Sequence, residues 1–484
     1  MVRERGWRLL LRVPDALARL GLVDRERARA TVDLAVPSMI SAGIWTILRI
    51  TDFFMVSLAL PDAAVAALEL SFQYYFVGFS LAIAVSSGTI SLVARFVGAE
   101  ERAMADFVIK QSLWFALLLA VPLMAASWLF ADGLLDVLSD DAVVIDFGAT
   151  YLRIVMLGLL FRFWTMIGSR GLQGAGDTRT PMYVNLLVVP INILLNALLI
   201  FGPGPFPQLD IAGAALGTVL ANGLGAAVFG WIYRSGRYDL RLRLGGRQWD
   251  TGVAAEILRV GVPLAARRLI GTLGRFPFLF VLGALGTPVV AAFAIGRQIV
   301  QLAMIPGWGY ATAASTLVGQ QLGGEGTDEA AGYGWDTVTV ALVTQLAIGA
   351  AFAVLARPIA HLFGTAAVDL TVAFIWTFAL GIAGSSVAQT LEGGLRGAGD
   401  TTWPLYGTAL GTLLRLGVAA LSLPAGLVLW RVAGFPLAPG LGLGVGAVFV
   451  SILVDMYSRA AINAVRFRSG RWRAVARRSA ARRE

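Results

Sequence analysis

The feature that most constrains this chain is a series of apolar runs of about twenty residues each, which is the length that a helix needs to cross a bilayer. The runs recur from near position 31 to near position 465. Hydrophobic residues make up 57% of the chain and charged residues 14%, whereas an ordinary soluble domain carries about 25% charged residues. The chain is therefore predicted to be an all-α, multi-pass membrane protein.

Breaks at glycine, proline and charge clusters divide this apolar sequence into twelve expected transmembrane helices. They are expected near residues 31–60, 63–93, 107–131, 143–169, 180–202, 211–234, 255–285, 288–318, 333–357, 370–394, 403–428 and 440–465.

The distribution of arginine predicts the orientation. Residues 1–30 hold eight arginines, the stretch "YRSGRYDLRLRLGGR" holds five, and nine more follow from Arg459 to the end. Because basic residues favour the cytoplasmic side, both termini and the linker at 235–254 are expected there, in the plasma membrane of a prokaryote. The acidic loop "GQQLGGEGTDEA" is the one stretch that disagrees.

The same charge pattern predicts lipid contacts and argues against nucleic acid as a partner. Residues 1–30 read as an amphipathic segment on the cytoplasmic face, with no cleavable signal, and residues 466–484 as a basic cytoplasmic tail. The basic residues lie in the tails and alternate loops, which is typical of a topology signal and of contact with anionic lipids.

A duplication organises the chain into two halves. "LAVPSMISAGIWTILR" from Leu34 matches "VGVPLAARRLIGTLGR" from Val260 at an offset of 226, and "VARFVGAE" matches "VGQQLGGE" at 225. "LQGAGDTRTPM" returns as "LRGAGDTTWPL" at 223. Two six-helix lobes, 31–234 and 255–465, are therefore expected, related by a pseudo-two-fold axis along the membrane normal. Parallel repeats of this kind are typical of secondary transporters.

The repeated "GAGDT" is predicted to be a helix-hairpin connection and not a substrate site. Its glycines allow a tight reversal with positive φ. Asp177 or Asp400 can then cap the following helix, and Pro181 and Pro404 fall in its first turn, where a missing N–H costs little.

Two six-helix halves, each with an "L-x-G-A-G-D-T-x-x-P" turn after its fourth helix, resemble the multidrug and toxic compound extrusion (MATE) family over roughly residues 31 to 465. The stretch "TDFFMVSLALPDAAVAALELSFQ" resembles the first hairpin of that family, and the archaeal and DNA-damage-inducible-type branches are the most similar. The resemblance implies an antiporter in which H⁺ or Na⁺ enters while an organic, often cationic, compound leaves.

The resemblance also implies a cation-coupling site in the N-terminal lobe. It places Asp52 on the first helix, Asn192 and Asn196 one turn apart on the fifth, and Thr218 on the sixth. The family pattern has an acid at the position of Asn196. An amide ligates Na⁺ through its carbonyl but takes up no proton, so H⁺ is expected as the coupling ion ahead of Na⁺, which would bind at the same four residues.

The depth of these residues supports the same cluster independently. Asp52 lies nine residues before Pro61, which is about 13 Å below the outer turn at ~1.5 Å per residue. Glu69, Asn192, Asn196 and Thr218 fall at comparable depths. An acid facing hydrocarbon costs about 2.5–3.5 kcal/mol on insertion scales, so the two acids are expected to face a wet cavity. Desolvation of a carboxyl raises its pKa and favours proton exchange near neutral pH.

Accessory residues are expected around this cavity. Gln73 and Tyr74 follow Glu69 by about one turn, and Pro190 interrupts the fifth helix as a candidate hinge. Arg49 lies one turn from Asp52, and the two form either a structural ion pair or a proton carrier with its tuning cation.

The C-terminal lobe shows no comparable acidic cluster, since Phe278 aligns with Asp52. Glu392 is expected to pair with Arg396 at i+4. Four arginines lie in or near the seventh and eighth helices: Arg267, Arg268, Arg275 and Arg297.

Three other classes of protein fit the sequence less well than a MATE-like antiporter. A flippase for lipid-linked oligosaccharides of the same superfamily would need a strongly cationic cleft, and these arginines provide some support for one. A major-facilitator carrier would need a different loop in place of "VARFVGAEERA". A membrane enzyme lacks sequence support, because the chain has no cysteine, one histidine (His361) and no nucleotide-binding loop. A monomeric transporter without a cofactor is expected.

Overall fold

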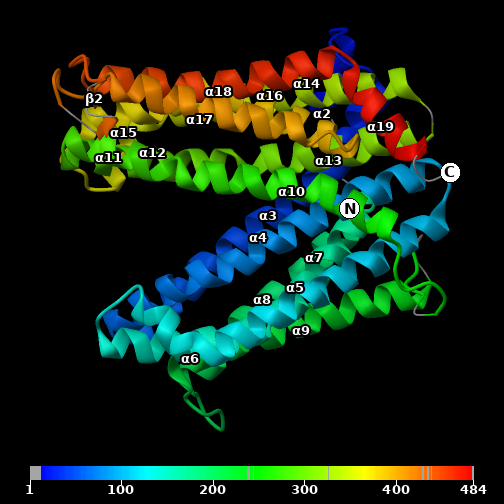
Figure 1. The fold of residues 1–484 in the computed structure, drawn as a ribbon, viewed down its shortest axis with the longest axis horizontal. Coiled ribbons are helices and arrows are strands. Elements are labelled where there is room, and N and C mark those ends of the chain that lie inside the picture. Colours follow the sequence, from blue (N-terminus) through cyan, green and yellow to red (C-terminus); the bar gives the residue numbers. More distant parts are fainter. Residues whose placement is uncertain are drawn as a thin grey trace. The chain divides into compact units, whose positions relative to one another are not determined.

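The structure is a computed structural model that describes residues 12–236, 240–243, 245–324, 326–427, 430–432, 435–437 and 439–481. The chain divides into two compact units (Figure 1). Unit 1 comprises residues 1–36, 266–318 and 326–478, and unit 2 comprises residues 37–265, 319–325 and 479–484. Boundaries between them fall inside helices, among them α3 (Arg25–Ala59), α10 (Thr251–Leu273) and α13 (Ile305–Gly323).

Helical segments cover all twelve predicted spans in the described part of the chain. In chain order they are α3 (Arg25–Ala59), α4 (Asp62–Gly98), α5 (Arg102–Asp136), α6 (Ala142–Leu157) with α7 (Leu159–Gly174), α8 (Arg179–Phe201), α9 (Asp210–Ser235), α10 with α11 (Arg275–Ala284), α12 (Thr287–Ala303) with α13 (Ile305–Gly323), α14 (Thr327–Val354), α16 (Val368–Gly397), α17 (Thr402–Ala420) and α18 (Val445–Arg468).

Short elements complete the described structure. They are helices α2 (Arg12–Arg19), α15 (Ala356–Leu362) and α19 (Arg471–Ala481), and the antiparallel strands β1 (Trp430–Val432) and β2 (Phe435–Leu437), in which Trp430 pairs with Leu437.

By length and apolarity alone, eight of the described helices qualify as membrane spans. The pairs α6–α7 and α12–α13 raise this number to ten, and they are bent by 45° and 41°. The two predicted spans left out of this selection correspond to α10–α11 and α17. Arginines interrupt their apolar sequences, among them Arg268 and Arg415.

Unit 2 is built around α4, which packs against α5, α6 and α7, while α9 packs against α6, α7 and α8. Its core buries large side chains that include Phe96, Phe163 and Phe229, each 1% exposed or less. Burial of an aromatic side chain of this size contributes about 1.5–3 kcal/mol.

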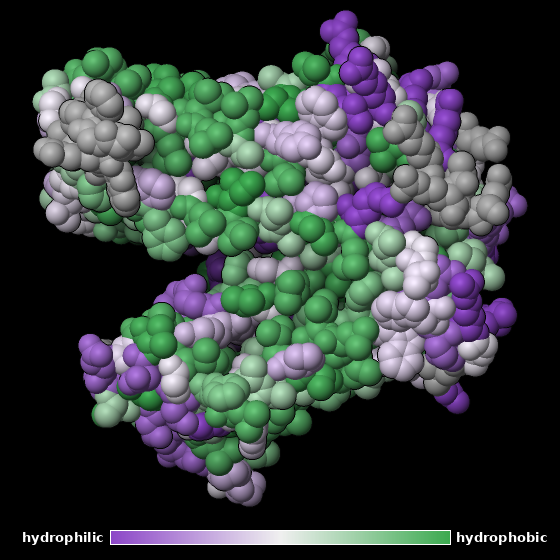
Figure 2. Space-filling view, in the orientation of Figure 1, coloured by the Kyte–Doolittle hydropathy of each residue, from purple (hydrophilic) through white to green (hydrophobic). Residues whose placement is uncertain are grey.

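Unit 1 packs α16 against α12, α14 and α18, and α18 against α17. Phe278, Phe293 and Phe374 form an aromatic chain in its core, with ring centroids 5.4 and 5.7 Å apart. Figure 2 shows an apolar surface along this helix layer, with hydrophilic residues gathered at the end where α2 and α19 lie. An apolar girdle of this kind fits a bilayer.

The predicted helix-hairpin turns are present in both copies of the "GAGDT" motif. Gly176 and Gly399 adopt φ angles of +95° and +80°. The N–H of Asp177 donates to Leu172 O at 2.9 Å and the N–H of Asp400 donates to Leu395 O at 2.8 Å. This six-to-one hydrogen bond with a left-handed glycine is the Schellman arrangement that ends a helix.

Candidate functional site

Three of the four predicted coupling residues meet in unit 2. Asn196 Nδ2 donates to Asp52 Oδ1 and also to Asn192 Oδ1, each at 2.9 Å. Helix α3 supplies Asp52, and α8 supplies both asparagines from one face because they are four residues apart. Asn192 and Asn196 are 2% and 1% exposed, so these hydrogen bonds lie in the interior of the unit.

The amide of Asn196 is only half satisfied. Its two N–H groups are used, while its Oδ1 is buried without a hydrogen-bond partner in the structure. Gly217 of α9 lies against this oxygen, and a Cβ at position 217 would collide with it. A buried carbonyl oxygen without a donor costs about 1–3 kcal/mol, so this atom is an available acceptor beside Asp52.

Thr218, the fourth predicted residue, follows Gly217 on α9. Its hydroxyl donates to Ala214 O at 3.0 Å on its own helix. The described contacts of its side chain therefore do not bring it to the carboxylate of Asp52.

The Arg49–Asp52 ion pair that the sequence allows is not formed among the described residues. The side chain of Arg49 is exposed, while Asp52 is half-buried. The carboxylate of Asp52 instead accepts its hydrogen bond from a neutral amide. Among the described residues, Asp52 therefore has a neutral amide and no cation as the hydrogen-bond partner of its carboxyl group.

The residues predicted at the accessory cavity separate into two groups. Glu69 is exposed and accepts a hydrogen bond from Gln73 Nε2 at 3.1 Å, one turn along α4. Tyr74 lies on the adjacent face, where its hydroxyl donates to Leu134 O of α5. None of the three contacts Asp52 in the described hydrogen-bond network, so they do not extend the cluster.

The sequence reasoning missed a second group in unit 2. Tyr151 of α6 lies within electrostatic range of both Asp52 and Tyr75, and Tyr75 lies within range of Arg162. The guanidinium of Arg162 lies 4.1 Å from the centroid of the Trp45 ring. The sequence feature that could have indicated this group was Arg162, a charged residue within the predicted span 143–169.

The candidate hinge at Pro190 lies within a continuous helix. Helix α8 extends through the proline from Arg179 to Phe201, and the ring of Pro190 is exposed. The proline still removes one backbone hydrogen bond beside Asn192, so a hinge at this position stays a prediction.

Glu392 of unit 1 pairs with a different arginine from the predicted Arg396. Glu392 pairs with Arg267 of α10, whereas Arg396 donates to Ser315 Oγ and Ala311 O of α13. The long side chain of Arg267 reaches Glu392 from a neighbouring helix, and α13 offers Arg396 neutral acceptors.

Asp400 differs from its counterpart in the first copy of the repeat. Asp177 caps α8, since its Oδ1 accepts from the N–H of Thr180 at 2.9 Å. Asp400 accepts from Arg466 Nε at 2.6 Å. Burial raises the pKa of Asp400, and the hydrogen bond and charge of Arg466 oppose that rise.

A duplicated, twelve-helix membrane fold with an intramembrane carboxylate defines a secondary transporter rather than an enzyme. The model of the MatE family matches residues 37–198 and 263–421, one segment in each copy of the repeat. The chain belongs to the MatE family.

Relatives and solved structures agree with this assignment. A probable multidrug resistance protein NorM of Thermotoga maritima is 28% identical over 84% of this chain and 85% of its own length. An FAD transporter of Shewanella oneidensis is 27% identical over 72% of this chain and 76% of its own length. A crystal structure of MATE in the bent conformation matches with a TM-score of 0.82 and 23% identity over 94% of this chain and 97% of that one, which shows the shared fold.

Proposed function

We propose that this MatE-family transporter is an H⁺-coupled antiporter that exports organic compounds, with Asp52 as the proton carrier. The observation that carries the proposal is the environment of Asp52, whose carboxylate is held by one neutral amide within the membrane-spanning part of unit 2. Ionisable residues at such positions are rare and usually functional, because they are costly in a bilayer.

The arrangement of Asn196 favours H⁺ over Na⁺. A Na⁺ ion at this site would need oxygen atoms from Asp52 and Asn192, and the N–H groups of Asn196 occupy one oxygen of each. A proton needs only the carboxylate.

The same contacts give protonation a structural consequence. Protonation adds to Asp52 a hydroxyl donor that needs an acceptor, while the remaining carbonyl oxygen of the carboxyl group can still accept from Asn196 Nδ2. The buried Asn196 Oδ1 is the acceptor without a partner. Rotation of the amide would relieve this mismatch and rearrange the contacts of α8 with α3, weakening substrate binding on the outward side. Return to the inward side would then release the proton.

Two substrate classes come from the relatives and from the family. Export of organic cations follows from the family resemblance. FAD, the compound named for the Shewanella oneidensis relative, carries a pyrophosphate and is an anion. Transport of lipid-linked oligosaccharides is the second candidate function, and the arginines of α10, α11 and α12 favour it because they offer positive charge to a pyrophosphate.

The proposal includes the placement of the chain in the cell membrane. Both termini and the linker lie in the cytoplasm, anionic lipids contact the basic tails, and the two lobes at 31–234 and 255–465 work as a monomer. The arginine distribution supports this orientation.

Proton counting tests the proposal directly. Purified protein in weakly buffered detergent is mixed with a panel of xanthene dyes, and the protons released on dye binding are measured at pH 6 to 8. We expect release from the wild type and none from Asp52→Asn. Asp132→Asn is the control, since Asp132 is an exposed acid paired with Arg153. Equal release from Asp52→Asn and the wild type would contradict the proposal.

A further inference from the structure

Unit 1 carries an excess of arginine in its membrane-spanning helices. Arg268 lies within electrostatic range of Arg267, Arg396 and Glu392, which makes three guanidinium groups around one carboxylate. A second group surrounds Asp455, which pairs with Arg415 and Arg459. Both groups therefore keep a positive net charge.

A strip of three arginines on neighbouring segments of unit 1 extends this excess of positive charge. Arg268, Arg275 and Arg297 form no hydrogen bond or ion pair with any residue that the structure describes, and they stand on α10, α11 and α12. Arg275 lies within electrostatic range of both Arg297 and Arg415. Arg268 and Arg275 are seven residues apart, about 10 Å along the helix at ~1.5 Å per residue.

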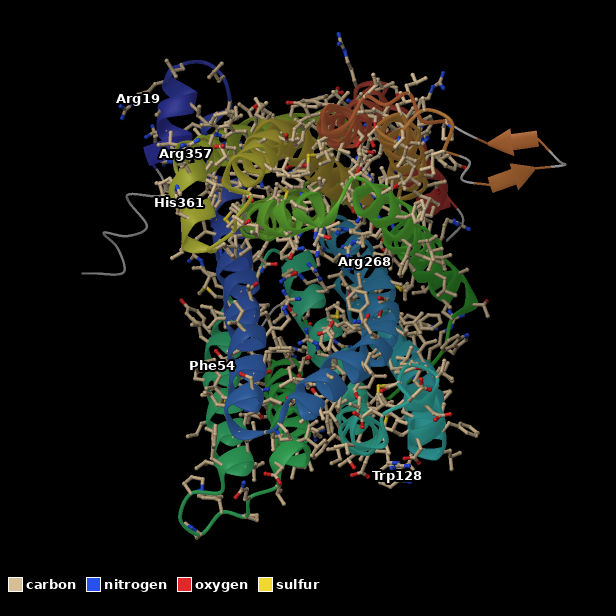
Figure 3. The ribbon with its side chains drawn as sticks, turned by 90° about the vertical axis from the view of Figure 1, so that its left-hand side faces the viewer. Arg19, Phe54, Trp128, Arg268, Arg357 and His361 are labelled. Carbon is tan, nitrogen blue, oxygen red and sulfur yellow. The ribbon has the colours of Figure 1, made fainter. Side chains whose placement is uncertain are left out.

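The position of Arg268 excludes two ordinary roles. It lies seventeen residues after the start of α10 and sixteen before the end of α11 (Figure 3), about 24 Å from either end at ~1.5 Å per residue. Because Arg268 lies midway along this helical stretch and a bilayer core is about 30 Å thick, it would lie about 15 Å from either surface, beyond the reach of an arginine side chain. Its side chain is exposed, and exposure of a guanidinium to hydrocarbon at this depth is energetically costly. It therefore faces water.

Unit 2 also carries a positively charged group among aromatic side chains. The guanidinium of Arg162 stacks on Trp45 and lies 5.2 Å from the centroid of the Phe79 ring. It forms no ion pair with a described residue. Such a cation over an aromatic face can bind the charged group of an aromatic anion.

We propose that the exported compound is an anion, an organic molecule with a phosphate or carboxylate group, and that Arg268, Arg275 and Arg297 bind that group. The planar guanidinium holds phosphate and carboxylate through paired hydrogen bonds. A strip of like charge repels an organic cation. The proposal rests on the transport function proposed above and names the substrate class of that transporter.

Matched dyes test the proposal without a variant. Carboxyfluorescein and rhodamine 123 share a xanthene ring and carry opposite charges. Proteoliposomes with an imposed pH gradient are assayed with each dye, and a fluorescent polyprenyl pyrophosphate is the lipid-linked arm. We expect transport of the free anionic dye over rhodamine 123. Transport of the pyrophosphate lipid alone supports the same anion site with a lipid source. Transport of rhodamine 123 with exclusion of both anions overturns the proposal.

Variants then locate the site. Arg268→Gln is expected to weaken equilibrium binding of carboxyfluorescein at least about tenfold, since it removes a charge-assisted hydrogen bond, and Arg268→Lys is expected to restore part of the binding. Arg357→Gln removes the same charge from α15, where Arg357 pairs with the exposed Asp369, and should change nothing. Unchanged binding in Arg268→Gln overturns the assignment. If that variant does not fold, the salt dependence of the wild type is measured instead, and carboxyfluorescein binding is expected to weaken as the salt concentration rises.

Failure of the coupling proposal would look different. If Asp52 is not the proton carrier, dye binding still depends on the arginines, but proton release is the same in Asp52→Asn and the wild type. If the substrate is not an anion, proton release persists with rhodamine 123 and the arginine variants bind that dye normally.

Discussion

Phe278 stands in the C-terminal copy of the repeat where Asp52 stands in the N-terminal copy. Phe278 is 1% exposed and packs in the aromatic core of unit 1, whereas Asp52 is half-buried and bonded to Asn196. Arg49 and Arg275 also correspond, and Arg275 lies within electrostatic range of Arg297 and Arg415. Duplication has kept the helices and separated the charges.

The two "GAGDT" turns also share their backbone geometry and differ in their side-chain partners. Both "GAGDT" motifs close the same Schellman turn, which is a backbone requirement met by Gly176 and Gly399. The aspartates next to them have different partners, the helix N-terminus for Asp177 and Arg466 for Asp400. Backbone geometry is therefore shared between the copies, while the side chains differ, and we propose proton coupling for those of unit 2 and anion binding for those of unit 1.

The largest effect on this division is expected for Glu392→Gln. The change leaves Arg267, Arg268 and Arg396 without their shared carboxylate, and removal of one partner of a buried ion pair costs about 3–5 kcal/mol. Binding of carboxyfluorescein is expected to tighten at the same time. Thermal unfolding in detergent and dye titration measure the two effects.

Asp369→Asn is the matched control for this change, because it breaks an ion pair whose side chains are 65% and 86% exposed. Its expected cost is about 0–1 kcal/mol. Equal destabilisation by the two variants would show that Glu392 does not hold the arginine group together.

A smaller effect is expected at the close approach beside Asn196. Gly217→Ala places a methyl group against Asn196 Oδ1, and overpacking of this kind costs about 1–3 kcal/mol. Gly223→Ala on the same helix adds a Cβ at 3.7 Å from Phe161, an ordinary contact, and should stabilise α9 by about 0.5–1 kcal/mol. Opposite shifts in unfolding temperature are the expected result; a gain in stability from Gly217→Ala would refute the packing described here.

The smallest effect is expected at the two aspartates of the repeated turn. Asp177→Ala removes a cap and should cost about 1 kcal/mol. Burial raises the pKa of Asp400 above its ordinary value of 3.8, so the folded protein holds this proton more tightly than the unfolded chain. That contribution to stability is complete below pH 3.8 and is lost as the pH rises through the folded pKa.

Asp400→Asn should therefore flatten the pH dependence of unfolding above pH 3.8 relative to the wild type. Unfolding followed by intrinsic fluorescence from pH 4 to pH 7 measures both slopes. A steeper slope in Asp400→Asn would contradict the expected sign.

Much of the fold was predictable because it depends on patterns that extend over many residues. Apolar runs and the constant offset of the repeat predicted twelve helices in two halves, and the structural neighbours confirm that fold. The left-handed glycines of both turns followed from local backbone chemistry.

Side-chain partners were harder to predict because they depend on which helices pack together. The i+4 rule suggested Arg396 for Glu392, while the structure supplies Arg267 from 125 residues away. The same rule suggested Arg49 for Asp52, and a neutral amide from α8 takes that place. Arg162 and Tyr151 gave only a weak signal, since their partners Trp45, Tyr75 and Asp52 come from other helices.

The most direct test of the central claim is dye efflux from proteoliposomes under separately imposed H⁺ and Na⁺ gradients, for the wild type and Asp52→Asn. We predict efflux by the wild type that follows the H⁺ gradient and ignores the Na⁺ gradient, with no gradient-driven efflux by Asp52→Asn. Efflux driven by Na⁺, or H⁺-driven efflux that survives in Asp52→Asn, would contradict the account.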